Sequence, residues 1–475
     1  MNVVDDSAPA VEEDRLADPR IDDVLKRLDA PGGYEAFAEA VRRAGCCRRP
    51  LRLTGRVTRN EGEGPRVVFD TKTLPDRMLL KACGSRRETL CPPCASVYRG
   101  DAFQLVAAGL RGGKGVPETV ADHPAVLVTL TAPSFGPVHR RTKDDRCHPR
   151  GRTCRHGTSL RCTTRHAEGD RLVGQALCPS CYDYDAAVLF NLSVSELWRR
   201  TSIYTLRSLG ELAGLSVRQV AKVVRLSYVK VIEFQRRGVV HVHAVVRLDA
   251  VAEELVGPPE GFNADLLARA VAVAVRKVHA PVAGQKGRGA VRVRWGRQLD
   301  VTVVAEACDL RRRAASYLAK YSTKSTDETG VLDHRLRVGL PGDADLSLQL
   351  RRLVAAAWEL GAEGSYRELH VRRWAHTLGF RGHFATKSRR YSTTFGELRL
   401  IRQRWRTAES GVMELEFGFK SDQAGGNLYM REWRVLGVGY LSAGDAWLAR
   451  GMADQRRMAL RAAYEERAYE WRRAA

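Results

Sequence analysis

Residues 239–246 read Val-Val-His-Val-His-Ala-Val-Val, a pattern typical of a β-strand with apolar residues on both faces. Because side chains alternate across a strand, His241 and His243 share one face, while Val240 and Val242 share the other. Two imidazoles ~7 Å apart on an apolar strand can bind one metal ion. A pair of hydrogen-bonded histidines inside a sheet explains the same pattern without a metal. The stretch therefore predicts a strand that carries two candidate metal ligands.

A second apolar stretch completes a predicted hairpin. Strands are expected at 226–235 and 239–248, and the loop Arg236-Arg-Gly238 has glycine last, which suits a type I turn closed by a bulge. In this register Glu233 faces His241, so that the hairpin offers two histidines and one carboxylate to a divalent ion. A slip of one residue would move Glu233 to the opposite face.

A predicted helix at 310–324 contains Tyr317-Leu-Ala-Lys-Tyr-Ser-Thr-Lys324. Tyr317 and Tyr321 are four residues apart and share a face, with Lys320 and Lys324 in an adjacent stripe. A tyrosine can act as a covalent nucleophile when cations stabilise its phenolate. Two tyrosines that pack on an amphipathic helix are the simpler alternative.

The chain has 11 cysteines, and all except Cys308 lie between residues 46 and 181. Clusters with Cys-x2-Cys spacing indicate metal binding rather than disulfides in a reducing compartment, and structural Zn²⁺ is the expected metal. Free buried cysteines would not explain the paired spacing. Two groups of zinc ligands are expected. The first is Cys47, Cys83, Cys91 and Cys94, and the second is Cys154, Cys162, Cys178 and Cys181, with His156 nearby. The pairing of the ligands stays open, and Cys147, His148 and His166 are unassigned.

The 475 residues carry a net charge of +23, which indicates a polyanionic partner, nucleic acid first of all. Residues 367–406 hold eleven Lys or Arg against two acids, with Trp374, Phe380, Phe384, Tyr391 and Phe395 interleaved. This composition suits single-stranded or melted DNA, whereas a solvated helix with its aromatic residues in the core is the alternative. The candidate DNA-binding residues are Arg311, Arg312, Arg313, Arg372, Arg373, Arg381, Lys387, Arg389 and Arg390.

The order of these motifs resembles that of the HUH endonucleases. A His-hydrophobic-His strand precedes Tyr-x2-Lys-Tyr-x2-Lys on a helix, and an earlier strand ends in Thr129-Leu-Thr131. The chain is most similar to the actinobacterial replication initiators of plasmids and integrative elements (the RepSA group). Four stretches within residues 40–410 carry this similarity: 91–94, 123–139, 177–184 and 372–394.

The resemblance implies an enzyme that nicks one DNA strand at an origin through Tyr321 or Tyr317. It would leave a 5′-phosphotyrosine link and a 3′-OH primer for rolling-circle replication. Mg²⁺ or Mn²⁺ bound by Glu233, His241 and His243 would be the catalytic cofactor, and histidine ligands favour Mn²⁺. The sequence lacks a Walker-type phosphate loop, so a host helicase and polymerase are expected partners. A two-tyrosine transposase and a non-catalytic zinc-containing DNA-binding regulator are the alternatives.

These patterns predict an α+β fold with zinc-binding cysteine-rich modules and a basic helical C-terminal region, and the resemblance implies that its core is an HUH nuclease of antiparallel sheet and helices. The first residues are acidic and lack the apolar run of a secretory signal, and no stretch reaches the ~18 apolar residues of a membrane helix. We therefore expect a cytoplasmic protein without a membrane partner. The expected segments are an acidic tail with a short helix (1–40), a zinc-binding module (41–123), the nuclease core (124–325) with a second zinc module at about 147–181, a linker (326–366) and the basic DNA-contacting region (367–475).

Overall fold

The computed structural model describes residues 18–60, 64–142, 146–282, 284, 290–304, 308–324, 335–336, 346–362, 364–410 and 428–474. The chain divides into two compact units, of which the smaller comprises residues 1–85, 90–95 and 413–475 and the larger comprises 86–89 and 96–412. No helix in the described ranges is long and apolar enough to cross a membrane. Of the expected linker 326–366, residues 326–334, 337–345 and 363 lie outside these ranges.

The larger unit is built on a five-stranded antiparallel sheet of order β10-β5-β6-β4-β9. The β-branched residues of the central hairpin favour this extended, buried conformation. Because β6 lies between β5 and β4, its histidines are in the middle of the sheet. The strands are β4 (Ala125–Leu130), β5 (Val224–Phe234), β6 (Val240–Ala250), β9 (Leu299–Val303) and β10 (Ala385–Lys387).

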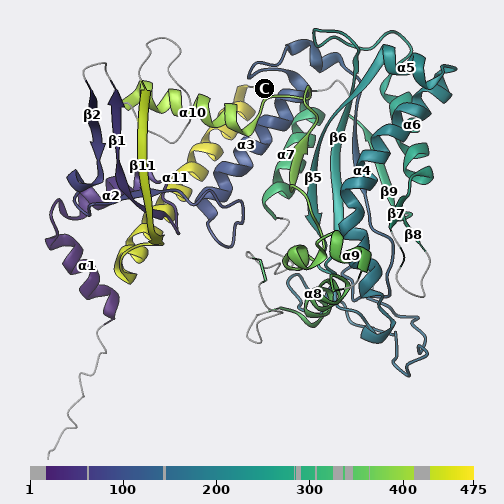
Figure 1. Ribbon diagram of the computed structural model, residues 1–475, viewed down its shortest axis with the longest axis horizontal. Helices are drawn as coiled ribbons and strands as arrows, with labels where there is room; N and C mark the ends of the chain where they lie inside the picture. Colours follow the sequence, from purple (N-terminus) through teal and green to yellow (C-terminus); the bar gives the residue numbers. More distant parts are fainter. Residues whose placement is uncertain are drawn as a thin grey trace, which may run out of the picture. The chain divides into compact units, whose positions relative to one another are not determined.

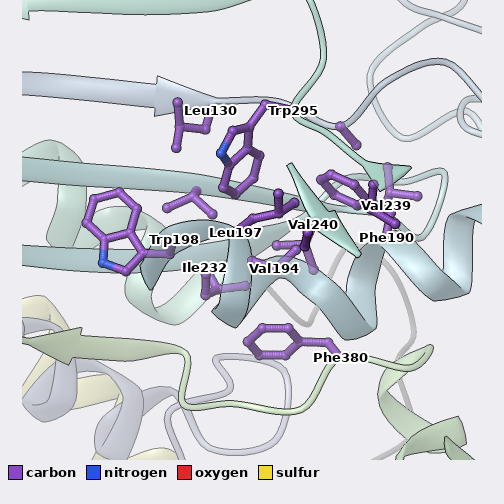
Figure 2. Packing of buried hydrophobic residues seen from close by; sticks show 14 of the residues in the cluster. Leu130, Phe190, Val194, Leu197, Trp198, Ile232, Val239, Val240, Trp295 and Phe380 are labelled. Atoms are coloured by element: carbon purple, nitrogen blue, oxygen red, sulfur yellow. The ribbon is translucent and has the colours of Figure 1, made fainter. Parts of the chain in front are cut away.

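Helices cover both faces of this sheet (Figure 1). On one face lie α4 (Tyr184–Ala213) and α6 (Ala264–Lys277), which begin at the side-chain caps Asp183 and Asn263. Figure 2 shows apolar side chains of α4 gathered with Ile232 and Val240 of the hairpin. The histidine face is covered by α7 (Cys308–Lys324) and by residues 96–111 of α3 (Pro92–Arg111). Because helices cover both faces of the sheet, β6 carries apolar residues on both of its faces.

The remaining elements of the larger unit are short or peripheral to this sheet. They are η2 (Glu118–Asp122), η3 (Pro179–Cys181), α5 (Val217–Val223), β7 (Ala280–Val282), β8 (Val291–Val293), α8 (Leu348–Leu360), α9 (Gly364–Glu368), η4 (Val371–Thr377) and α10 (Phe395–Ser410).

The smaller unit joins elements from the two ends of the chain. Its central strand β1 (Leu51–Asn60) pairs in antiparallel fashion with three strands, β2 (Pro65–Asp70), β3 (Leu79–Lys81) and β11 (Leu428–Val438). The buried guanidinium of Arg27 donates to the carboxylates of Asp445 and Asp76, in both cases at 2.8 Å. The other elements are α1 (Pro19–Asp29), α2 (Gly33–Arg43), η1 (Thr71–Thr73) and α11 (Ala443–Ala474).

The mixed α/β composition and the antiparallel sheets agree with the sequence-based expectation. Residues 367–475 were expected to be helical, but in the structure this region also contains the strands β10 and β11. Each of these strands pairs with a strand far away in the sequence, and such pairing leaves no local pattern. The structure also groups β11 and α11 with the N-terminal elements rather than with residues 367–410.

Candidate metal and tyrosine site

The β5–β6 hairpin has the register that the sequence predicts. Glu233 is the strand partner of His241, and the backbone N–H of Gln235 donates to the carbonyl of Val239. Gly238 closes the loop with a φ of 80°, a left-handed conformation that glycine adopts readily. The hairpin thus presents Glu233, His241 and His243 on the face towards α7, with their ligand atoms all within 4.8 Å of one another.

The electrostatics of this group suit a cation. His243 Nε2 lies 2.8 Å from Glu233 Oε2. Burial, followed by the neighbouring charges of His243 and Arg237, lowers the pKa of His241 to about 3, so His241 is neutral at pH 7 and has a lone pair to donate. His241 Nε2 is buried and has no hydrogen-bond partner within the described structure. A buried orphaned nitrogen beside a carboxylate and a second imidazole is what a bound divalent ion would satisfy.

The second nitrogen of His243 connects the hairpin to two further elements. Its Nδ1 lies 3.2 Å from Thr129 Oγ1 on β4 and 3.5 Å from the phenolic oxygen of Tyr317 on α7. Thr129 reaches this place because it is the strand partner of His243. The Tyr321 ring stacks on the His243 imidazole at 4.5 Å, and the two tyrosine rings are 4.6 Å apart. One imidazole is therefore in contact with both predicted nucleophiles.

The two tyrosines are half-buried, whereas Lys320 is exposed. Burial, and then the neighbouring Tyr321, raises the pKa of Tyr317 above its ordinary value. Its phenolate therefore needs stabilisation by a cation or a hydrogen-bond donor. Lys320 is exposed on α7, and Lys324 is the last residue of that helix, with its side chain outside the described part of the structure. Their expected role beside the tyrosines stays a prediction.

The turn of the hairpin is held by buried polar side chains that sequence reasoning did not identify. Asn191 on α4 is fully buried, donates to the carbonyls of Gly238 and Leu378, and accepts from the N–H of Val240. Asn191 occupies an apolar stretch of α4, and an asparagine at a core position is the signal that could have revealed it. Such a fully satisfied group fixes the position of the turn, and with it Glu233 and His241.

The structure brings together the first expected group of cysteines. Cys47, Cys83, Cys91 and Cys94 of the smaller unit, here called the Cys47 cluster, have their sulfur atoms within 4.8 Å of one another. The distances from Cys83 Sγ to Cys94 Sγ and from Cys91 Sγ to Cys47 Sγ are both 3.7 Å. Hydrogen bonds from the other thiols, Cys47 most strongly, lower the pKa of Cys91, which favours the thiolate that a metal binds.

The second expected group is divided between two clusters of the larger unit. Cys162 was expected with Cys154, but the backbone of His148 pairs with that of Cys162 and thereby places Cys162 near Cys147. His139, Cys147 and His166 were not among the expected ligands. Each of the two clusters could hold a metal ion. We call them the Cys162 cluster (His139, Cys147, Cys162 and His166) and the Cys154 cluster (Cys154, His156, Cys178 and Cys181).

The candidate DNA-binding arginines have different degrees of exposure. Arg311 differs from the expectation, because it is only 4% exposed and donates to the carbonyl of Leu110 at 2.7 Å. Three others donate to backbone carbonyls within the unit while remaining exposed or half-buried, namely Arg372, Lys387 and Arg390. The rest are exposed, namely Arg312, Arg313, Arg373, Arg381 and Arg389.

The aromatic residues between these arginines are not all available for base stacking. Phe380 and Tyr391 lie in the core, where the Tyr391 hydroxyl donates to the carbonyl of Val106. Trp374, Phe384 and Phe395 are half-buried. Of these five side chains, the three half-buried ones are accessible for base stacking.

Comparison with known proteins identifies the family. Residues 33–454 match the family described as "Replication initiator protein, pSAM2" (RepSA). The chain is 39% identical over 452 residues to a replication initiator protein of Streptomyces ambofaciens, and the match covers 93% of this chain and 94% of that protein. No solved structure matches the chain. The matched residues include every candidate site described above, and the resemblance to the RepSA group is confirmed: the chain belongs to the RepSA family of replication initiator proteins.

Proposed function

We propose that this replication initiator is an HUH-type endonuclease that nicks one strand of its origin through a tyrosine. The observation that carries the proposal is the meeting of three elements at His243. Glu233 and His241 lie beside His243 in the hairpin, while Tyr317 and Tyr321 approach its ring from α7. Metal ligands and nucleophilic hydroxyls in contact are the combination that phosphodiester transfer requires.

The reaction is a transesterification. The phenolic oxygen of one tyrosine attacks the phosphorus, the bond to the 3′ oxygen breaks, and the phenolic proton leaves to solvent. The departing oxygen takes up a proton and becomes a 3′-OH, while the 5′ phosphate stays on the tyrosine. With two tyrosines, the second can cut the regenerated origin while the first still holds the old end. Tyr321, next to Lys320 in the sequence, is our first choice of nucleophile.

His243 has a defined role in this reaction. If His243 ligates through Nε2, its one N–H proton is on Nδ1 and could be donated to the phenolic oxygen of Tyr317 or to Thr129 Oγ1. That donation stabilises a phenolate, which offsets the unfavourable effect of burial on Tyr317.

The donor set fits a divalent ion. Glu233, His241 and His243 would hold Mn²⁺ or Mg²⁺, which would polarise the scissile phosphate. The histidine content favours Mn²⁺. The four thiols of the Cys47 cluster suit structural Zn²⁺, whose role is to stabilise the smaller unit. Origin DNA, single-stranded or melted, is the substrate, and a host helicase and polymerase would unwind the template and extend the 3′-OH.

A covalent-adduct assay tests the proposal. The full-length protein and Mn²⁺ are mixed with labelled single strands that tile its gene and flanks, and the products are separated under denaturing conditions. We expect a protein-linked 5′ end that His241→Ala abolishes and that Tyr321→Phe or Tyr317→Phe assigns to a nucleophile. Tyr204→Phe on α4 is the matched control and should leave the adduct intact. Absence of an adduct on every strand, with DNA binding retained, would favour a non-catalytic regulator.

A further inference from the structure

The segment from 137 to 181 of the larger unit has almost no hydrophobic interior of its own. In its described part the regular structure amounts to the short turn η3 and isolated bridges. The buried residues of that part are Cys147, His166, Gly174 and Cys178. Three of these four belong to the Cys162 or Cys154 clusters. A segment of this size without an apolar core needs another source of stability, and metal coordination is a common one.

The Cys162 cluster has the dimensions of a tetrahedral zinc site. With Zn–N near 2.05 Å and Zn–S near 2.3 Å, ligand atoms are ~3.3 Å apart for two nitrogens and ~3.6 Å apart for nitrogen and sulfur. His139 Nδ1 lies 3.2 Å from His166 Nε2, and His166 Nε2 lies 3.5 Å from Cys162 Sγ. Cys147 Sγ lies 3.8 Å from His139 Nδ1. Two imidazoles and two thiols therefore converge at the spacing that one zinc ion requires.

Asp170 supplies an independent indication of a metal at this cluster. Its carboxylate accepts a hydrogen bond from His166 Nδ1 at 2.6 Å, which fixes the tautomer and turns Nε2 towards the sulfur atoms. A carboxylate behind a histidine is the usual support of a zinc ligand, because it orients the ring and increases the basicity of the coordinating nitrogen.

The Cys154 cluster is built around His156. Its Nδ1 lies 3.1 Å from Cys181 Sγ, 3.8 Å from Cys178 Sγ and 4.0 Å from Cys154 Sγ. Cys178 and Cys181 are at the two ends of the η3 turn, where the N–H of Cys181 donates to the carbonyl of Cys178. One imidazole and three thiols offer a second complete set of four ligands.

The two sets alternate along the chain. His139 and Cys147 are followed by Cys154 and His156 of the other set, then by Cys162 and His166, and finally by Cys178 and Cys181. Ligand pairs of one site therefore alternate with ligand pairs of the other along the chain, so neither site is contained within a separate loop.

The same segment contacts the turn of the β5–β6 hairpin. Arg236 in that turn donates to the carbonyl of Asp170 at 3.0 Å. Gly174 packs so closely on Arg236 that a Cβ at this position would lie 2.5 Å from the Arg236 carbonyl carbon. Gln349 of α8 accepts from the N–H of Ala176 and donates to the carbonyl of Arg237, both at 3.3 Å. The support of His166 by Asp170 and the contact of Asp170 with Arg236 connect the Cys162 cluster directly to the turn.

We propose that residues 139–181 bind two zinc ions in interleaved, cross-braced sites, and that this module holds the hairpin turn that carries the candidate catalytic ligands. The first ion is bound by the Cys162 cluster and the second by the Cys154 cluster. The inference depends on ligand geometry and on contacts with the turn, so it stands or fails independently of the nicking activity.

Zinc content of the full-length protein, measured in the wild type, Cys154→Ser, Cys162→Ser and the double variant, is the first test. We expect each single variant to lose at least one ion and the double variant to lose two. A double variant that loses the same single ion as either single variant would place both cysteines in one site and overturn the proposal. His148→Gln is the matched control, because only the backbone of His148 pairs with Cys162, whereas its side chain is outside both clusters and donates from Nε2 to the Val138 carbonyl at 2.9 Å. It should retain all the zinc.

A variant that keeps all eight ligands distinguishes a specific loss of zinc affinity from general misfolding. Asp170→Asn should weaken zinc binding at the Cys162 cluster ~10- to 100-fold, as measured by competition with a chelator, and should leave the Cys154 cluster unchanged. An unchanged affinity at both clusters, or an equal loss at both, contradicts the assignment.

Hydrogen exchange tests the bracing of the turn. Removal of zinc, or Cys162→Ser, should increase exchange of the amides of residues 235–241 at least tenfold, while amides at the centre of α6 serve as the reference. Unchanged exchange at the turn after the zinc has been lost would overturn that part of the proposal.

Discussion

The phenolic oxygen of Tyr317 lies 3.5 Å from Nδ1 of His243, although 74 residues separate the two in the chain. The opposite nitrogen of the same ring lies 2.8 Å from the carboxylate of Glu233. The His243 imidazole therefore contacts Glu233, which is a proposed metal ligand, and Tyr317, which is a proposed nucleophile. Proton placement on His243 is consequently coupled to cation binding, and this coupling leads to the first prediction.

Thr129→Val should raise the Mn²⁺ concentration that half-maximal nicking requires. Thr129 Oγ1 lies 3.2 Å from His243 Nδ1 and orients the ring. Loss of such a support typically reduces metal affinity or activity ~10- to 100-fold. A Mn²⁺ titration of adduct formation measures the effect, and Thr129→Ser should restore most of it. Thr302→Val, at an exposed position of the neighbouring strand β9, should behave as the wild type.

Asn191→Ala should lower the free energy of unfolding by about 2–4 kcal/mol, because it leaves two carbonyls and one N–H unpaired in the core. Denaturant titration of the full-length protein measures the change. Ser195→Ala on the same helix is the comparison, since Ser195 makes a single exposed bond to the carbonyl of Arg381 and should cost at most about 1 kcal/mol. Equal effects of the two substitutions would show that Asn191 does not support the turn.

Lys230→Met should stabilise the protein at pH 7. Lys230 is 6% exposed on β5, and burial lowers its pKa to about 8. At pH 7 the ammonium is charged in both states, and its burial costs the folded state about 2–3 kcal/mol. Between about pH 8 and the ordinary lysine value the unfolded chain binds the proton that the folded protein has lost, so wild-type stability rises with pH in this window.

The gain from Lys230→Met should therefore be largest at pH 7 and should shrink as the pH rises above about 8. Thermal unfolding at a series of pH values measures it. Lys222→Met, at an exposed position of α5, should give no such trend. A gain that is independent of pH would point to apolar packing instead of charge burial.

Exposed arginines of the 139–181 segment should contribute to DNA affinity. Arg150, Arg152 and Arg155 are exposed and lie close to Cys154 in the sequence. Neutralising all three should weaken binding of single-stranded DNA uniformly across sequences, and should reduce the slope of log affinity against log salt by about one unit per lost phosphate contact. Fluorescence anisotropy at several salt concentrations measures this slope.

Three exposed arginines of the helices opposite α7 provide the control for that experiment. They are Arg207, Arg218 and Arg269. Neutralising them removes the same net charge, so an equal loss of slope would indicate a general charge effect and not contact by the module.

The sequence alone determined the hairpin and its register. Alternation of valines and histidines requires two covered faces, and Arg236-Arg-Gly238 favours a short turn, so Glu233 was expected to face His241, as it does in the structure. These are local constraints that act over a few residues. The spacing of Tyr317 and Tyr321 likewise followed from the helical period, and both lie on the face of α7 towards His243.

The tertiary structure decided which distant groups meet. Cysteine spacing is compatible with several pairings, and only the backbone pairing of His148 with Cys162 separates the Cys162 cluster from the Cys154 cluster. The pairing of β11 with β1 and the burial of Arg311 similarly depend on contacts between segments remote in sequence. Such contacts form when the folding chain closes long loops, and local sequence patterns do not specify which distant segments come together.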